Sequence, residues 1–296
     1  MIPLLSEICQ ELDAASLEWR HPHVGECPVQ TEPYGCIMCR RRTDGLMIPV
    51  VAVEMDPDLA RSGIVSYPEN FMAEGSLVIT RDRWERQREM TRARLLAHLG
   101  IFRQIYARNC EIRRIDKPTA SHFLERCHSY GDATCKFRYG MFLKRSTGAH
   151  NTRFLAPGTL VAVSTFSGAR RWQKEDKVVA SYEWTRYASL PDVRICGGMG
   201  KMLQFFIDEL APDDVMSYAD LEWSQGTVYE SLGFVSEGCR GPVDFEIDCS
   251  DWTRRPLTSR KTCQVPETGE IKNQESEKIS YRSPGSIKYR LKLTEY

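Results

Sequence analysis

The 296-residue sequence contains no apolar run long enough to cross a membrane, and its 40 basic and 40 acidic side chains cancel. Its first residues lack the apolar core of a secretion signal and the Arg- and Ser-rich character of a transit peptide. Without excess charge there is no global field that attracts nucleic acid, so such binding needs a local basic patch. We therefore expect a soluble intracellular protein with no membrane partner, cytoplasmic in the first instance, with the nucleus and organelles left open.

A paired cysteine framework is also missing. The 11 cysteines are odd in number and scattered, which argues against a disulfide scaffold and for a reducing compartment. One Cys-x-x-Cys pair, Cys36 and Cys39, follows Cys27 and the histidines His21 and His23. Such a pair can hold zinc from a tight turn, and Cys27 with either histidine would complete a tetrahedral site. The sequence thus predicts a structural zinc on Cys27, Cys36 and Cys39; the alternative is a loop with free thiols.

The sequence does contain a glycine cluster, Gly197, Gly198 and Gly200, followed directly by Lys201. Apolar side chains then recur at helical spacing until Pro212. A glycine loop that opens a helix presents unpaired backbone N–H groups and the positive end of the helix dipole, which suits a phosphate or pyrophosphate. The alternative is an ordinary turn before a helix.

Beyond this helix the pattern predicts a strand over residues 215–219 and a second helix, which Ser224 can cap and which ends at Gly233-Phe234. A glycine loop followed by a helix ending Tyr-x-x-x-Gly-Phe resembles the GNAT N-acyltransferase fold. In that family the loop holds the pyrophosphate of acyl-coenzyme A, and the tyrosine, here Tyr229, often protonates the departing thiolate. The usual Gln/Arg-x-x-Gly-x-Gly/Ala loop is altered here, because the last glycine after Arg194 lies one place late.

A narrower resemblance is to a GNAT-like group of phage DNA-modification (Mom-like) proteins and of phage proteins in which a homing-endonuclease-like segment precedes the same domain. These share a Gly-Gly-x-x-Lys-Leu-Leu type loop and a Tyr-Ala-Asp-x-x-Trp-Ser-x-Gly-x-x-Tyr-x-x-Leu-Gly-Phe run. The matching residues are Gly197, Gly198, Lys201, Tyr218, Ala219, Asp220, Trp223, Ser224, Gly226, Tyr229, Gly233 and Phe234. The similarity extends upstream to about Trp84.

The resemblance implies an α+β or α/β fold, a GNAT-like mixed and mostly antiparallel sheet flanked by helices. It implies an acyltransferase that uses acyl-coenzyme A, in the first instance acetyl-coenzyme A, to modify an amine, and it makes a nucleobase amine a reasonable acceptor. Backbone N–H groups near the domain's fourth strand, predicted over residues 178–190, would hold the thioester carbonyl. The implied coenzyme-binding residues are Arg194, Gly197, Gly198, Met199, Gly200, Lys201 and Ser224.

Four side chains are candidates for catalysis or substrate binding. His128 or Asp220 would deprotonate the amine, since a histidine titrates near neutral pH and a carboxylate can orient an amine or accept its proton. Tyr229 would be the general acid, and Arg186 on the fourth strand would bind an acidic group or phosphate. The alternatives stay open: a surface histidine, a turn aspartate, a half-buried tyrosine on a helix face, and an arginine paired with Glu183.

The most basic stretch, residues 81–108, predicts an arginine-rich helix that breaks at Gly100. Such a helix can lie along a phosphate backbone; the alternative is a solvated face paired with its own acids at i±3 and i±4. The first reading supplies the rival function, a non-catalytic nucleic-acid-binding protein with a GNAT-like fold. The oligomeric state stays open.

These patterns divide the chain into four parts. Residues 1–80 form an N-terminal region, zinc-binding or degenerate nuclease-like, with buried strands over 48–56 and 76–80. Residues 81–109 form the basic connecting helix, 110–250 the GNAT-like domain, and 251–296 a polar loop with a final edge strand.

Overall fold

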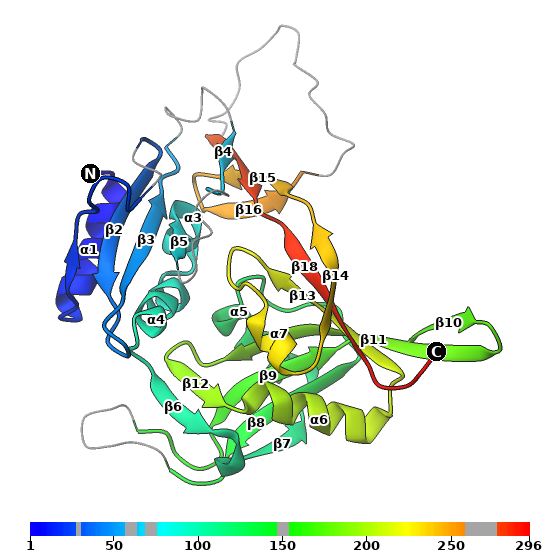
Figure 1. The fold of residues 1–296 in the computed structure, drawn as a ribbon. Coiled ribbons are helices and arrows are strands. Elements are labelled where there is room, and N and C mark those ends of the chain that lie inside the picture. The colour runs from blue at the N-terminus through cyan, green and yellow to red at the C-terminus, as the bar shows by residue number, and fades with distance from the viewer. Residues whose placement is uncertain (28–30, 57–63, 69–75, 147–153, 258–276) are drawn as a thin grey trace, which may run out of the picture. The chain divides into compact units, whose positions relative to one another are not determined.

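The computed structural model describes residues 1–27, 31–56, 64–68, 76–146, 154–257 and 277–296 (Figure 1). The chain forms two compact units, one from Met1–Ile101 with Gly241–Gly285 and one from Phe102–Arg240 with Ser286–Tyr296. This division differs from the sequence-based one. The basic stretch belongs to the first unit as far as Ile101, and the chain leaves the second unit after Arg240 before its last strand returns.

The first unit packs helices on one face of a sheet and a second sheet on the other. The central sheet runs β1-β2-β3-β5, and the second runs β16-β15-β17-β4. Val50 and Ala52 of β3 face the helices, whereas Val51 and Val53 face the second sheet. Because successive side chains of a strand point to opposite faces, this predicted apolar strand is buried on both sides. The elements are α1 (Pro3–Ala14), β1 (Trp19–Arg20), β2 (Tyr34–Arg40), β3 (Met47–Val53), β4 (Val65–Ser66), β5 (Leu77–Thr80), α3 (Arg81–Arg86), α4 (Arg88–His98), β15 (Val243–Asp248), β16 (Thr253–Pro256) and β17 (Lys278–Ser283).

The predicted zinc site does not form. Cys36 and Cys39 lie three positions apart in strand β2 and not in a turn, so their side chains point to opposite faces. Cys36 joins Cys27 in the core toward the second sheet, and Cys39 joins the core under the helices. Across the described ranges, no group of three or more Cys, His, Asp or Glu side chains is placed to hold a metal ion. Cys39 is fully buried and packs as a small apolar side chain, and this burial raises the pKa of its thiol to about 12.

The predicted basic helix is broken. α3 ends at Arg86 and α4 begins at Arg88, because Gln87 between them has φ −127° and ψ 41°. Further along, residues 103–106 form a strand instead of a helix.

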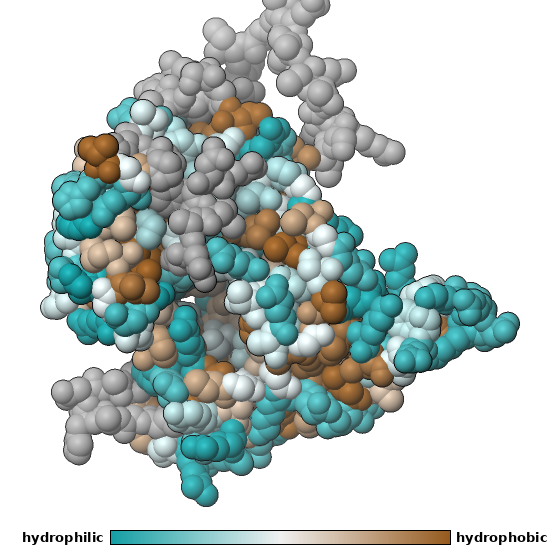
Figure 2. All heavy atoms as spheres, viewed as in Figure 1, coloured by the Kyte–Doolittle hydropathy of each residue, from teal (hydrophilic) through white to brown (hydrophobic). Residues whose placement is uncertain are grey.

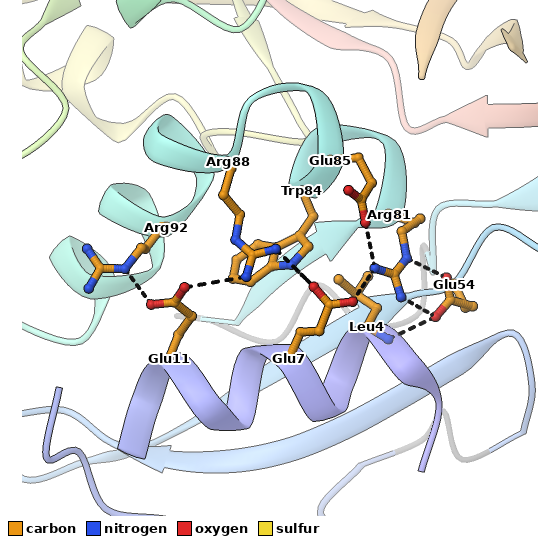
Figure 3. Close-up of polar contacts among 9 residues, drawn as sticks. All are labelled: Leu4, Glu7, Glu11, Glu54, Arg81, Trp84, Glu85, Arg88 and Arg92. Atoms are coloured by element: carbon orange, nitrogen blue, oxygen red, sulfur yellow. Dashed lines mark hydrogen bonds and ion pairs between the residues drawn. The ribbon is translucent and has the colours of Figure 1, made fainter. Parts of the chain in front are cut away.

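Three arginines of α3 and α4, Arg81, Arg88 and Arg92, bind carboxylates outside these helices (Figure 3). Arg81 donates two hydrogen bonds to Glu54, at 2.7 and 2.9 Å, and one to Glu7 of α1 at 2.6 Å. Arg88 also reaches Glu7, at 2.9 Å, and its guanidinium lies 4.1 Å from the ring centroid of Trp84. Hydrogen bonds from Arg81, Trp84 and Arg88 outweigh burial and lower the pKa of Glu7 to about 2. This network fastens α1 to α3 and α4.

A buried ion pair ties the returning segment to α3. Arg254 of β16 donates to both oxygens of Asp82, at 2.7 and 3.0 Å. The two side chains are 7% and 2% exposed. Removing one partner would leave a buried charge unpaired, at a cost of roughly 3–5 kcal/mol. Residues far apart in the sequence thereby form one core.

The second unit is a mixed sheet with α5 on one face and α6 and α7 on the other. Its strand order is β7-β8-β9-β11-β13-β18-β14, with β10 paired to the first half of β11 and a separate pair, β6 and β12. Within the large sheet the neighbours are antiparallel except β11 and β13, which are parallel. This is the mixed, mostly antiparallel GNAT-like sheet that the resemblance implied.

The elements of this unit include the helix that starts at the glycine cluster and the strand and helix that were predicted after it. They are β6 (Arg103–Tyr106), the 3₁₀ turn η2 (Ala107–Asn109), β7 (Cys110–Arg114), α5 (Lys117–Cys127), β8 (Phe137–Leu143), β9 (Leu160–Phe166), β10 (Arg170–Lys174), β11 (Lys177–Ser189), β12 (Val193–Cys196), α6 (Gly198–Leu210), β13 (Asp214–Asp220), α7 (Thr227–Ser231), β14 (Val235–Arg240) and β18 (Ser286–Lys292). Among the described residues no helix is long and apolar enough to span a bilayer.

The last strand is not an edge strand, contrary to the prediction. β18 lies between β13 and β14 and is antiparallel to both. Its Tyr289 is therefore buried in the core of the second unit. The alternating pattern of this strand reflects one face toward that core and one face away from it.

We expect Glu7→Gln to lower the free energy of unfolding at neutral pH by about 1–2 kcal/mol, since a charged acceptor is lost but a third of its side chain is exposed. The wild-type carboxylate has a depressed pKa, so its contribution is complete above pH 4.5 and is lost as the pH falls toward about 2. Urea unfolding across this range should show the gap between wild type and variant closing. Glu89→Gln, at an exposed position on α4, is the control, and a gap that is constant with pH would contradict the assignment.

Candidate functional site

A bulge in β11 decides which of its side chains face α6 and which face α5. The register with β9 shifts between Trp184 and Arg186. Before the bulge, Tyr182 and Trp184 face the core with α6; after it, Tyr187 faces that core and Ala188 faces α5. Arg186 is two residues from Ala188, so it lies on the α5 face by strand alternation.

The parallel ladder between β11 and β13 is short. Its last pair is Glu183 with Met216, and beyond it β11 continues with β9 and β13 with β18. At this point a side chain bridges the strands, because the hydroxyl of Ser217 donates to the carbonyl oxygen of Trp184 at 3.0 Å. Beyond this bridge, the backbones of β11 and β13 are no longer paired with each other.

The predicted glycine cluster opens α6. Gly197 is the N-cap, with φ 73°, a left-handed conformation that glycine adopts without strain, and it supplies no side-chain cap. The first helical hydrogen bond runs from the N–H of Lys201 to the carbonyl of Gly197, at 3.0 Å. Within the described chain, the N–H groups of residues 198–200 donate no hydrogen bond. These donors lie at the positive end of the helix dipole and can bind an anion.

A row of aromatic rings joins this loop to Tyr229. A Cβ atom on Gly198 would lie 2.7 Å from the hydroxyl oxygen of Tyr187. The ring of Tyr187 meets Trp184 edge to face at 6.1 Å between centroids, and Trp184 meets Tyr229 in the same way at 6.3 Å. The loop needs glycine here because Tyr187 fills the space of a side chain.

The hydroxyl of Tyr229 lies at the end of the parallel ladder. It hydrogen-bonds with the hydroxyl of Ser217 at 3.0 Å, and its ring stacks on Tyr289 at 5.2 Å. Burial raises the pKa of Tyr229, and the hydrogen bond with Ser217 opposes that rise. The phenol therefore keeps its proton at neutral pH and can act as a donor.

Lys201 points to the backbone rather than along the glycine loop. Its ammonium donates to the carbonyl oxygens of Ala107 and Cys110, at 3.0 and 2.6 Å. This contact anchors the start of α6 to η2 and β7. The predicted contact with a pyrophosphate would require Lys201 to leave these acceptors.

Two other predicted coenzyme-binding side chains have local partners. The guanidinium of Arg194 lies 4.5 Å from the ring centroid of Phe102. Ser224 is not the N-cap of α7, as its spacing predicted. Gly226 is the N-cap, with φ 85°, and the hydroxyl of Ser224 accepts a hydrogen bond from the Gly226 N–H at 3.1 Å.

The α5 face carries Arg186 and the loop after α5. The Nε of Arg186 donates to the carbonyl of Gly131 at 3.1 Å. Burial lowers the pKa of Arg186, and the nearby charges of Glu183 and Asp132 oppose this effect. His128 ends α5, and its Nδ1 accepts a hydrogen bond from the N–H of Tyr130 at 3.1 Å. A base that used this lone pair would have to release the loop first.

Asp220 closes β13 on the same face as Arg186. Val215 and Ala219 of this strand face α6, so Asp220 lies on the opposite side by alternation. Its Oδ1 accepts a hydrogen bond from the Glu222 N–H at 3.0 Å, which makes it a turn residue, as the alternative reading held. The predicted residues thus divide between two faces: the loop and Tyr229 on the α6 side, Arg186 and Asp220 on the α5 side.

Sequence reasoning missed Ser217 and Tyr187. Each places a hydroxyl beside a predicted site residue, Ser217 at Tyr229 and Tyr187 at Gly198. The strand pattern marks Ser217 as inward-facing, because it alternates with Val215 and Ala219, and that signal could have identified it. The bulge that turns Tyr187 toward α6 has no corresponding signal in the sequence.

No family model matches the chain, and no curated protein matches it. Solved structures with some likeness include the NatC complex bound to Gag peptide and CoA, with 12% identity over 63% of this chain and 99% of that one, at a TM-score of 0.34. The ribosomal-protein-S18-alanine N-acetyltransferase from Escherichia coli has 15% identity, covering 63% and 96%, at 0.33. A Bacillus subtilis acetyltransferase in complex with CoA has 13% identity, covering 62% and 99%, at 0.29. Scores at this level carry no inference about function, and the fold rests on the strand order above.

We expect Gly198→Ala to lower stability by about 1–3 kcal/mol, because its methyl group would meet the hydroxyl of Tyr187 and the side chain of Ile195. Tyr187→Phe should restore part of this loss, giving a favourable coupling of roughly 0.5 kcal/mol or more in a double-mutant cycle. Thermal or urea unfolding of the four proteins measures it. Gly168→Ala is the control, since its nearest neighbour would be Lys136 Cδ at 3.6 Å. Additive effects would show that the two side chains do not meet.

Proposed function

We propose that this chain is a GNAT-like N-acyltransferase that transfers an acyl group, acetyl in the first instance, from acyl-coenzyme A to an amine. The observation that carries the proposal is the uncapped glycine start of α6, which adjoins Tyr187 and connects through a row of rings to the protonated hydroxyl of Tyr229. In this proposal the start of α6 is the anion site, and Tyr229, at the end of the parallel ladder of β11 and β13, is the proton donor. Acyl-coenzyme A contains a pyrophosphate and a thioester, so its reaction needs both an anion site and a proton donor.

Different residues would bind the coenzyme, hold the carbonyl and transfer the protons. Acyl-coenzyme A supplies the activated thioester carbonyl. The N–H groups of residues 198–200 would bind the pyrophosphate, and backbone N–H groups of β11 beyond the bulge would hold the carbonyl oxygen. As the amine nitrogen bonds to the carbonyl carbon, the C–S bond breaks and Tyr229 gives its proton to the leaving sulfur. His128 or Asp220 would take the proton from the amine, and Asp220 already lies at the end of β13.

The Mom-like resemblance makes a nucleobase amine the acceptor of choice. Arg186, partly buried on the α5 face, would bind a phosphate next to that base. The rival proposal, a non-catalytic protein that binds nucleic acid through residues 81–108, gains no support from the contacts of Arg88 and Arg92. Arg88 pairs with Glu7 and Glu11 of α1, and Arg92 pairs with Glu11.

Calorimetric titration with acetyl-coenzyme A tests the coenzyme site. Cys196 is exposed directly before Gly197, so a charge placed there would act on the loop without filling the Gly198–Tyr187 contact. We expect saturable binding that Cys196→Glu weakens about tenfold or more, through repulsion of the pyrophosphate, whereas Cys196→Gln does not. Equal weakening by both variants would point to packing, and no binding by the wild type at millimolar ligand would overturn the proposal.

Replacing Tyr229 tests the proton donor. Tyr229→Phe should lower kcat by about 10²–10⁴-fold with little change in the Kd for acetyl-coenzyme A. Thiol release in the presence of single-stranded DNA of mixed sequence measures the turnover. Ser217→Ala is the matched control, because it removes the same hydrogen bond but keeps the phenol. Full activity of Tyr229→Phe would remove the tyrosine from the mechanism, and an equal loss in both variants would assign the effect to positioning.

A further inference from the structure

A cavity of about 270 Å³ opens on the sheet of the second unit, on the face away from α6. The strands place it there, because Val215 and Tyr289 face the α6 core while Met216, Tyr218 and Lys288 alternate with them. The cationic and aromatic side chains that line the cavity are Arg170, Trp172, Tyr218, Arg240, Lys288 and Arg290. They come from four strands, β10, β13, β14 and β18. We call this the β10–β18 cavity.

The cavity has an excess of positive charge. Arg290 is neutralised by Asp214 and Glu237, both at 2.6 Å, and Lys288 shares Glu237 at 2.6 Å. Arg170 and Arg240 are exposed, and neither forms an ion pair with an acid in the part of the chain that the structure describes. Figure 2 shows hydrophilic side chains over the projecting β10–β11 hairpin. Since the acids and bases of the whole chain balance, this is a local concentration of cations.

Aromatic rings lie among these cations. The guanidinium of Arg240 lies 4.7 Å from the ring centroid of Tyr218. Trp172 is 37% exposed on β10, and its ring meets Tyr296 edge to face at 5.5 Å. A planar base can stack on an indole ring or on a guanidinium already stacked on a tyrosine. Cations alone would suit any anion, but cations with exposed aromatic groups favour an anion that carries a planar ring.

We propose that the β10–β18 cavity binds a nucleotide, with its phosphate on Arg170 and Arg240 and its base against Trp172. The volume lies just below the ~300–1,000 Å³ of small-molecule sites, which fits a single nucleotide unit. That unit is either a free nucleotide or one residue of a single strand, since a base inside a duplex cannot stack on a side chain. The site lies on the other face of the sheet from α6 and its glycine loop. The proposal does not depend on acyl transfer.

The test is a titration of the full chain with adenosine monophosphate and with a fluorescent single-stranded thymidine oligonucleotide. Arg170→Gln with Arg240→Gln should weaken binding at least about tenfold. For the oligonucleotide it should also reduce the slope of log affinity against log salt by about 0.7, because the two arginines bind one phosphate. The control is Arg108→Gln with Arg113→Gln, which makes the same change in charge at two exposed positions. Arg113 is in β7 and Arg108 precedes it, and β7 is the edge of the sheet opposite to β14. Trp172→Ala should weaken binding and Trp172→Phe should retain most of it.

The comparison of probes identifies the source of the nucleotide. Equal affinities would assign the cavity to a free nucleotide, and much tighter binding of the oligonucleotide would assign it to single strands. Absence of binding by both probes at millimolar concentration, or binding unchanged in the Arg170/Arg240 variant, would overturn the proposal. So would competitive displacement by acetyl-coenzyme A that Cys196→Glu weakens and Cys196→Gln does not, because the cavity would then belong to the coenzyme site. Failure of acetyl-coenzyme A to bind at all would end the acyltransferase proposal and leave this one standing.

Discussion

The parallel contact between β11 and β13 constrains the rest of the second unit. Two parallel strands cannot be joined by a hairpin, so the chain must cross over, and α6 is that crossover. The start of the crossover helix then lies beyond the carboxyl end of β11, which is where open α/β sheets bind their ligands. The glycine loop, the end of the ladder and the hydroxyl of Tyr229 all belong to this region because the ladder stops after Glu183 and Met216.

The bulge in β11 adds a second constraint, since it reverses which face each following residue occupies. Without it, Tyr187 would point toward α5 and could not fill the space beside Gly198, and Arg186 would point toward α6. One extra residue thus gives the two faces different chemistry. The α6 side carries the uncapped start of α6 and a phenol, and the α5 side carries an arginine and a carboxylate.

Local signals predicted the elements well, and contacts between elements much less well. The apolar run of β3, the glycine start of α6 and its end before Pro212 follow from composition and periodicity, which act over a few residues. The zinc site failed because a Cys-x-x-Cys spacing is the same in a turn and in a strand, and only the strand separates the side chains. The break at Gln87 has no glycine or proline to announce it. The position of β18 depends on partner strands more than forty residues away in the sequence. The acceptors of Lys201 are backbone carbonyls, and because every residue has one, the sequence does not indicate which of them Lys201 will reach.

The balance of charge in the sequence also conceals where charge is available. The arginine-rich α3 and α4 suggested a nucleic-acid surface, yet three of their six arginines, Arg81, Arg88 and Arg92, bind Glu54 or carboxylates of α1 and hold a core together. In the part of the chain that the structure describes, the acids that bind Lys288 and Arg290 form no ion pair with Arg170 or Arg240. A chain with no net charge can therefore carry a basic site, and which arginines form it depends on which carboxylates the fold brings within reach.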